Sequence, residues 1–152
     1  MNEFDEKESW ELIKKEYSVS KREFGKRIFF IKDEYKRKII FRDIAQAHIL
    51  SQTGFFKPAV VLAGSILEEL LRLYLENKKV STKNINNFND YIESCKKHGL
   101  LKINIAELTH VLRGFRNLIH IKNEVSKKEN ITKSTAIASV SSIFTIANNF
   151  KK

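Results

Sequence analysis

Apolar side chains recur every three or four residues along most of this chain, which is the repeat of an α-helix. Trp10, Ile13 and Tyr17 share one side of a helix predicted over residues 9–17. A longer stretch between residues 20 and 52 has the same spacing, at Ile31, Tyr35, Ile39, Ile40, Ile44 and Ala47. The pattern therefore predicts a short helix followed by a long one.

Capping and turn residues indicate where these helices begin and end. Ser20 and Glu23 form a capping box that marks the start of the long helix, and Gly25 could interrupt it early. Gly54 can adopt the left-handed conformation that ends a helix. Pro58 then suits the first position of the next helix, because its missing N–H needs no partner there.

The second half of the chain contains three further predicted helices after a central one. Residues 59–77 are apolar on nearly every side, which predicts a buried central helix. A polar loop over 79–86 leads to a helix over 88–98 that ends at Gly99, and a second capping pattern starts a helix over 104–121. We expect residues 123–130 to form a polar, mobile loop and residues 132–150 to form the last helix.

Few residues that favour turns separate these segments, since the chain has 5 glycines and 1 proline. Folds built from strands and tight turns need more of both, so the composition favours an all-α fold. We expect an up-and-down bundle of four to five helices over residues 30–152. Residues 1–29 would form an N-terminal helical extension of that bundle.

The charge of the chain is strongly positive and unevenly distributed. The formal net charge is +10, whereas residues 1–20 carry three basic and six acidic side chains. A basic body with an acidic leader favours a polyanionic partner such as nucleic acid. Because 21 of the 28 basic residues are lysines, the coding bias of an AT-rich genome is an alternative explanation.

Other features exclude several classes of protein. A single cysteine, Cys95, excludes a disulfide framework and suits a reducing compartment. The N-terminus does not resemble a signal peptide and the apolar stretch 58–66 is too short to span a bilayer, so we expect a cytoplasmic protein. The histidines lack metal-ligand spacing and there is no glycine-rich phosphate loop, so we predict no metal and no cofactor. We interpret the basic run over 36–38 as a solvated helix face rather than a nucleic-acid patch.

On the predicted helix over 104–121, polar side chains gather beside the apolar stripe. Arg113, Asn117 and His120 are neighbours at i, i+4 and i+7, and Arg116 lies one turn before His120. Two arginines in a lysine-rich chain favour a planar anion such as phosphate, which a guanidinium binds through two hydrogen bonds. The alternative is structural: Arg116 would pair with a glutamate of the central helix, and His120 would be an ordinary polar residue.

The string LRGFRNLIHIKNE, residues 112–124, resembles the signature of HEPN (higher eukaryotes and prokaryotes nucleotide-binding) domains. The stretches FRDIAQAHILSQTGFFKPAVVLAGSILEELLRLYL and NDYIESCKKHGLLKINIAELTHVL are similar to the rest of that fold, so the resemblance covers about residues 30–150. It implies a helical bundle that commonly dimerises across the motif helix. Many members are metal-independent ribonucleases of toxin, abortive-infection or RNA-processing systems, while others only dimerise, bind nucleotides or act as sensors.

The resemblance also implies roles for individual residues. The family motif is an arginine, four to six residues and a histidine, which fits Arg113 and His120 as catalytic residues. Arg116 has only three intervening residues but precedes Asn117, the polar residue that often follows the arginine, so either arginine could take the role. Asn117 and Lys122 would bind the RNA phosphate or ribose. Toxin-type members carry a tyrosine at the position of Lys122.

The sequence therefore predicts a metal-independent ribonuclease, acting as a toxin or an antiviral effector. Histidine can serve as base or acid near neutral pH, and arginine stays charged. Two chains across a two-fold axis would place the histidine and the arginines of each copy around one phosphate. Glu68 or Glu69 could position Arg116 from the central helix. The expected partners are a second copy, RNA or a nucleotide, and a cognate antitoxin or effector protein, with no membrane. The alternative is a non-catalytic HEPN module for dimerisation, nucleotide binding or partner binding.

Overall fold

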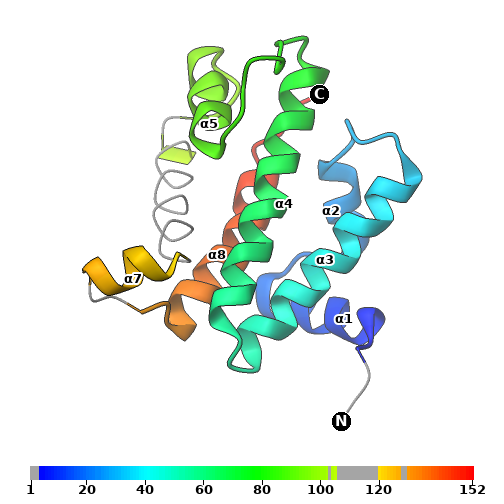
Figure 1. Cartoon of the computed structure of the whole chain (residues 1–152). Helices are drawn as coiled ribbons and strands as arrows, with labels where there is room; N and C mark the ends of the chain where they lie inside the picture. Colours follow the sequence, from blue (N-terminus) through cyan, green and yellow to red (C-terminus); the bar gives the residue numbers. More distant parts are fainter. Residues whose placement is uncertain (1–3, 103, 106–119, 128–129) are drawn as a thin grey trace.

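Polar side chains start most helices of this computed structural model, which describes residues 4–102, 104–105, 120–127 and 130–152. Asp5 accepts a hydrogen bond from the backbone N–H of Glu8 at 3.1 Å and starts α1 (Glu6–Tyr17). Ser20, Asp33, Asn87 and Thr132 do the same for α2 (Lys21–Arg27), α3 (Glu34–Gln52), α5 (Phe88–Lys97) and α8 (Lys133–Ala147). Figure 1 shows these helices together with α4 (Phe56–Asn77) and α7 (Ile121–Lys127).

The described part of the chain is helical and contains no strands, so the predicted all-α bundle is confirmed. The helix starts predicted near residues 20, 88 and 132 are confirmed, whereas α1 begins at Glu6 rather than at the predicted residue 9, and the start of α3 after Asp33 was not predicted. Each cap is a local interaction over three residues, and it satisfies a backbone N–H that has no partner inside the helix. None of these described helices is long and apolar enough to cross a bilayer.

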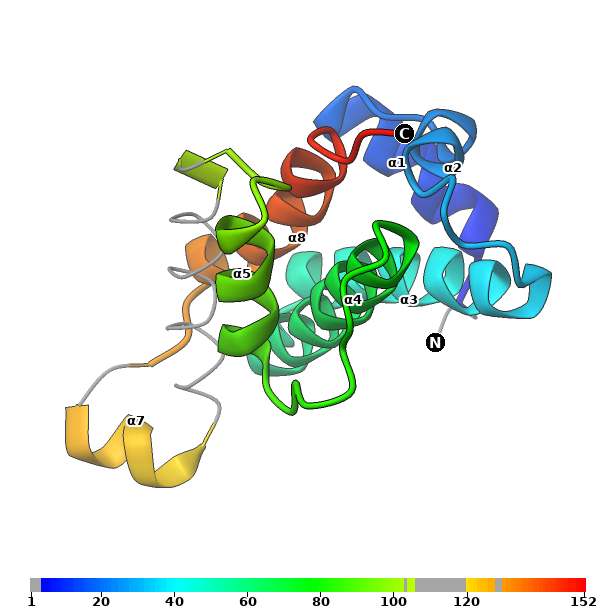
Figure 2. The same ribbon diagram turned by 90° about the horizontal axis from the view of Figure 1, so that it is seen from above.

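The central position predicted for the apolar helix is confirmed for α4. It packs against α3, α8 and α5, and Figure 2 shows these three helices on different sides of it. The side chains of Leu67, Leu70 and Leu71 are fully buried. Pro58 was predicted to be the first residue of this helix. The helix begins at Phe56, so Pro58 is its third residue. Pro58 remains in the first turn, where a helix does not need the missing N–H.

The single long helix predicted over residues 20–52 is wrong, because residues 28–33 separate α2 from α3. Gly25 lies inside α2 and is not the break. Ile28 and Ile31 are buried in the core at the break. The guanidinium group of Arg37 closes it: it donates hydrogen bonds to the carbonyl oxygens of Gly25 at 2.8 Å, Ile28 at 3.0 Å and Ile31 at 3.1 Å. Side-chain burial and these bonds compensate for the helical hydrogen bonds that the break removes.

The helices of the predicted N-terminal extension share the core of the bundle. Trp10 is 4% exposed and Phe24 is fully buried. The indole N–H of Trp10 donates to the carbonyl oxygen of Phe41 at 3.1 Å, and its ring lies edge-on to that of Phe144 with the centroids 6.3 Å apart. Aromatic side chains from α1, α2, α3 and α8 thus meet in one cluster. The acidic α1 therefore packs against the basic body of its own chain.

A helix replaces part of the loop predicted over residues 123–130, since α7 covers residues 121–127. The segment is polar but contains neither glycine nor proline, the two residues that most strongly disfavour a helix. The last helix, predicted over 132–150, is shorter and spans residues 133–147. Both views place α7 at the edge of the molecule, away from α2 (Figures 1 and 2).

Cys95 is fully buried in α5. Burial raises the pKa of its thiol to about 12, so the thiol stays protonated and unreactive at neutral pH. We expect native protein to react with a disulfide reagent such as DTNB only as fast as the chain opens, and denatured protein to react at once. Absorbance of the released thiolate measures both rates. Fast, complete labelling of the native protein would contradict the burial of this thiol.

Candidate functional site

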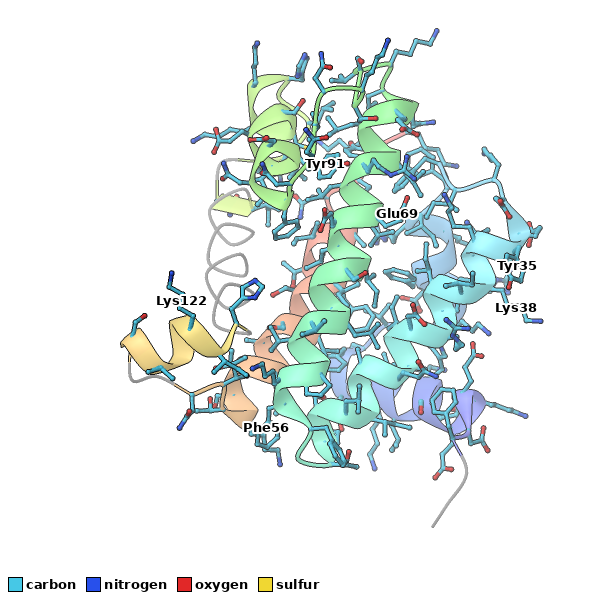
Figure 3. All side chains as sticks on the ribbon, viewed as in Figure 1. Tyr35, Lys38, Phe56, Glu69, Tyr91 and Lys122 are labelled. Atoms are coloured by element: carbon cyan, nitrogen blue, oxygen red, sulfur yellow. The ribbon has the colours of Figure 1, made fainter. Side chains whose placement is uncertain are left out.

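His120 and Lys122 are the predicted site residues from the motif that lie within the described part of the chain. His120 is exposed and directly precedes α7, and Lys122 is exposed in the first turn of that helix. Figure 3 shows Lys122 on α7 at the edge of the bundle. Arg113, Arg116 and Asn117 lie outside the described residues. The described part of the predicted motif is therefore an imidazole and an ammonium group open to solvent.

An apolar pair lies on α7 beside these polar side chains. Ile121 and Val125 are 74% and 70% exposed, and their spacing of four residues places them on one face of the helix. A single exposed apolar side chain is ordinary on a protein surface, whereas adjacent large ones at a surface edge are typical of a contact with another molecule. The exposed imidazole of His120 thus borders a surface that a second molecule could cover.

Glu69, a predicted supporting residue on α4, is held by two cations. Its carboxylate accepts a hydrogen bond from Arg72, and its Oε1 lies 3.6 Å from the Nζ of Lys36 on α3. Arg72 also donates to Glu76 at 2.8 Å. Burial lowers the pKa of Arg72, but the hydrogen bonds and charges of the two glutamates outweigh burial and raise it. Figure 3 shows Glu69 well apart from Lys122, so these two predicted site residues do not come together.

Tyr91 of α5 packs against the same acidic side of α4. It is 7% exposed, and its hydroxyl donates to the carbonyl oxygen of Ile85 at 3.4 Å. Burial raises the pKa of Tyr91, the charge of Arg72 lowers it, and the charge of the half-buried Glu68 raises it further. Sequence analysis singled out neither Arg72 nor Tyr91. The spacing from Glu69 was a readable signal for Arg72, whereas only the packing of α5 on α4 places Tyr91 there.

The other described histidines do not extend the site. His48 is 1% exposed, and its Nε2 lies 3.1 Å from the Oε2 of Glu16. His98 is exposed at the end of α5, where its Nδ1 donates to the carbonyl oxygen of Ser94 at 2.8 Å. Within the described ranges, no three histidine, cysteine, aspartate or glutamate side chains are grouped so that they could hold a metal ion.

Comparisons with protein-family models, with curated proteins and with solved structures find no match to this chain. The resemblance to HEPN domains therefore depends on the motif over residues 112–124 and on the two stretches quoted with it. Two structural features are consistent with this resemblance: the all-α bundle and the exposed imidazole of His120.

Proposed function

We propose that this chain is a metal-independent ribonuclease of HEPN type that works as a homodimer. The observation that carries the proposal is the exposed imidazole of His120 next to the exposed pair Ile121 and Val125. In a dimer with two-fold symmetry, each residue near the axis meets its own copy. A second copy that covers the apolar pair would therefore bring two His120 side chains to one cleft.

Two imidazoles are enough to cleave RNA without a metal. One takes the proton of the ribose 2′-hydroxyl, whose oxygen attacks the adjacent phosphorus, and the other protonates the 5′-oxygen as its bond to phosphorus breaks. The products are a 2′,3′-cyclic phosphate and a 5′-hydroxyl. Arg113 or Arg116 would stabilise the negative charge on the phosphate oxygens, and Asn117 and Lys122 would hold the strand.

The charge of the chain supports a polyanionic substrate, because a formal net charge of +10 attracts RNA over long range. In this proposal the dimer acts in the cytoplasm as a toxin or an antiviral effector, and a cognate protein controls it. The exposed side of α7 is the surface that such a protein would reach.

RNA cleavage in the presence of EDTA tests the proposal. We expect the wild type to cleave single-stranded RNA to 2′,3′-cyclic phosphate ends, and His120→Ala to be at least about 100-fold slower, because it lacks the acid and the base. His98→Ala is the matched control, since it also removes an exposed imidazole but should keep the wild-type rate. Light scattering checks that both variants keep the oligomeric state of the wild type.

Two results would contradict this function. Equal rates for the wild type and His120→Ala would place the activity elsewhere in the chain or in a contaminant. Absence of cleavage by any of the three proteins would instead favour the non-catalytic binding module that the resemblance also allows.

A further inference from the structure

A hollow of about 750 Å³ lies between α2 and the C-terminal end of the chain, and most charged side chains that line it are positive. They are Lys26 and Arg27 from α2, Arg37 from α3 and Lys152 from the C-terminal end. Glu23 is the acidic side chain among the lining residues. Figure 2 shows the C-terminal end of the chain close to α2, which explains how residues so far apart in sequence share one hollow.

A second hollow, of about 640 Å³, adjoins the first, because Gly25, Lys26 and Arg37 line both. It adds Lys21 and Arg22 at the start of α2. We call the two hollows together the α2 groove. Its cations therefore lie along two adjoining open hollows, and a chain-like anion could contact several of them at once.

Most cations of the α2 groove keep an unneutralised charge. Arg37 is half-buried and its guanidinium binds three backbone carbonyl oxygens, which orient the group without cancelling its charge. The interpretation of residues 36–38 as a solvated face is therefore wrong for Arg37. In the described part of the chain, no carboxylate forms an ion pair with the following cations of the groove: Arg22, Lys26, Arg27, Arg37 and Lys152.

Aromatic rings lie among these cations. The Nζ of Lys152 is 5.9 Å from the ring centroid of Phe29. Phe41 has the Nζ of Lys21 at 5.1 Å and the Cζ of Arg37 at 5.7 Å from its ring centroid. Both rings are half-buried, so part of each remains accessible in the groove. Alternating cations and accessible rings are the elements with which proteins bind the phosphates and the bases of single strands.

We propose that the α2 groove binds a single-stranded nucleic acid through its phosphates. The cations would contact successive phosphates, and Phe29 and Phe41 would contact bases that are free of a partner strand. An acidic protein would use the cations but would leave the rings unused, so the observations favour a nucleic acid. Figures 1 and 2 place α2 and α7 at opposite ends of the molecule, so this surface is distinct from that of His120 and does not require the proposed cleavage.

Fluorescence anisotropy with a labelled single-stranded DNA oligonucleotide tests the proposal. The DNA lacks a 2′-hydroxyl and cannot be cleaved by the proposed chemistry, so binding is measured by itself. The groove variant neutralises three exposed cations: Arg22→Gln, Lys26→Gln and Arg27→Gln. The control variant makes the same change of net charge at exposed positions elsewhere: Lys83→Gln, Lys96→Gln and Lys97→Gln. Circular dichroism checks that both are folded.

We expect the groove variant to bind at least about 10-fold more weakly than the wild type, and the control variant to change by about 2-fold or less. The slope of log affinity against log salt concentration should also become shallower by about 2 in the groove variant, since each of the three lost phosphate contacts in a single strand contributes about 0.7 to that slope. No binding by the wild type, or equal losses in the two variants, would overturn the proposal. Competition by polyglutamate as strong as by unlabelled DNA would overturn it in favour of an acidic protein.

A second measurement uses only the wild-type chain and so does not depend on the variants folding. Backbone amide chemical shifts followed during titration with the same DNA should change at residues 21–29 and 150–152. Changes confined to residues 83–98 would overturn the proposal. DNA binding at the groove without RNA cleavage would support this inference and contradict the proposed ribonuclease function. RNA cleavage without DNA binding at the groove would support the ribonuclease function and contradict this inference.

Discussion

Replacing Tyr74 with alanine is expected to lower the free energy of unfolding by about 3–5 kcal/mol, the range usual for removing a large buried aromatic ring. Tyr74 of α4 is 1% exposed. Its ring centroid lies 4.5 Å from that of Phe150 and 5.3 Å from that of Phe30. The ring therefore joins the central helix to the C-terminal end and to the segment between α2 and α3. Its removal leaves a cavity where three distant parts of the chain meet.

Tyr74→Phe is the matched control, because it keeps the ring and removes only the hydroxyl. That hydroxyl accepts a hydrogen bond from the backbone N–H of Lys151 at 3.0 Å, so we expect a loss of about 1 kcal/mol. Urea denaturation followed by circular dichroism measures both variants. Equal losses for Tyr74→Ala and Tyr74→Phe would assign the effect to the hydrogen bond. A loss below about 1 kcal/mol for Tyr74→Ala would contradict the packing role of the ring.

Arg37→Met is expected to lower the free energy of unfolding by about 2–4 kcal/mol. It keeps most of the apolar stem but removes the hydrogen bonds to three carbonyl oxygens at the break between α2 and α3. The carbonyl oxygens of Gly25 and Ile31, which lose this donor while partly buried, account for most of the cost, since that of Ile28 still accepts from the backbone N–H of Ile31 at 3.0 Å. Arg37→Lys should recover little of the loss, since one ammonium group cannot match the planar fork of a guanidinium.

Thermal unfolding compares these variants with the wild type, and hydrogen exchange locates the effect. Protection of the amides around residues 28–33 should fall before that of α4, because the lost bonds fasten that segment. Full stability in Arg37→Lys would show that charge alone is sufficient. A change below about 0.5 kcal/mol in Arg37→Met would mean that burial of Ile28 and Ile31 holds the break without the guanidinium.

Sequence reasoning about the candidate site extends only to residues that are neighbours along one predicted helix. The helical spacing predicts that His120 lies beside Arg113 and Asn117, which are outside the described residues, and the motif gives the imidazole a chemical role. The spacing could not show that Glu69 is already held by Lys36, because that contact joins α4 to α3. For the same reason the sequence did not identify the α2 groove.

The amino-acid sequence by itself determined most of the helices and several of their starts. Asp5, Ser20 and Asn87 cap backbone groups three residues away, and the apolar spacing of α4 marks it as the buried element, so both signals act within a few residues. Beyond the local cap at Asp33, tertiary structure decided the break at residues 28–33 and the inclusion of α1 in the core. The break depends on the hydrogen bond from Arg37 of α3 to Gly25 of α2, and the position of α1 depends on the contact of Trp10 with Phe41. The energy of both contacts comes from burial between elements, which the local periodicity of the sequence does not reveal.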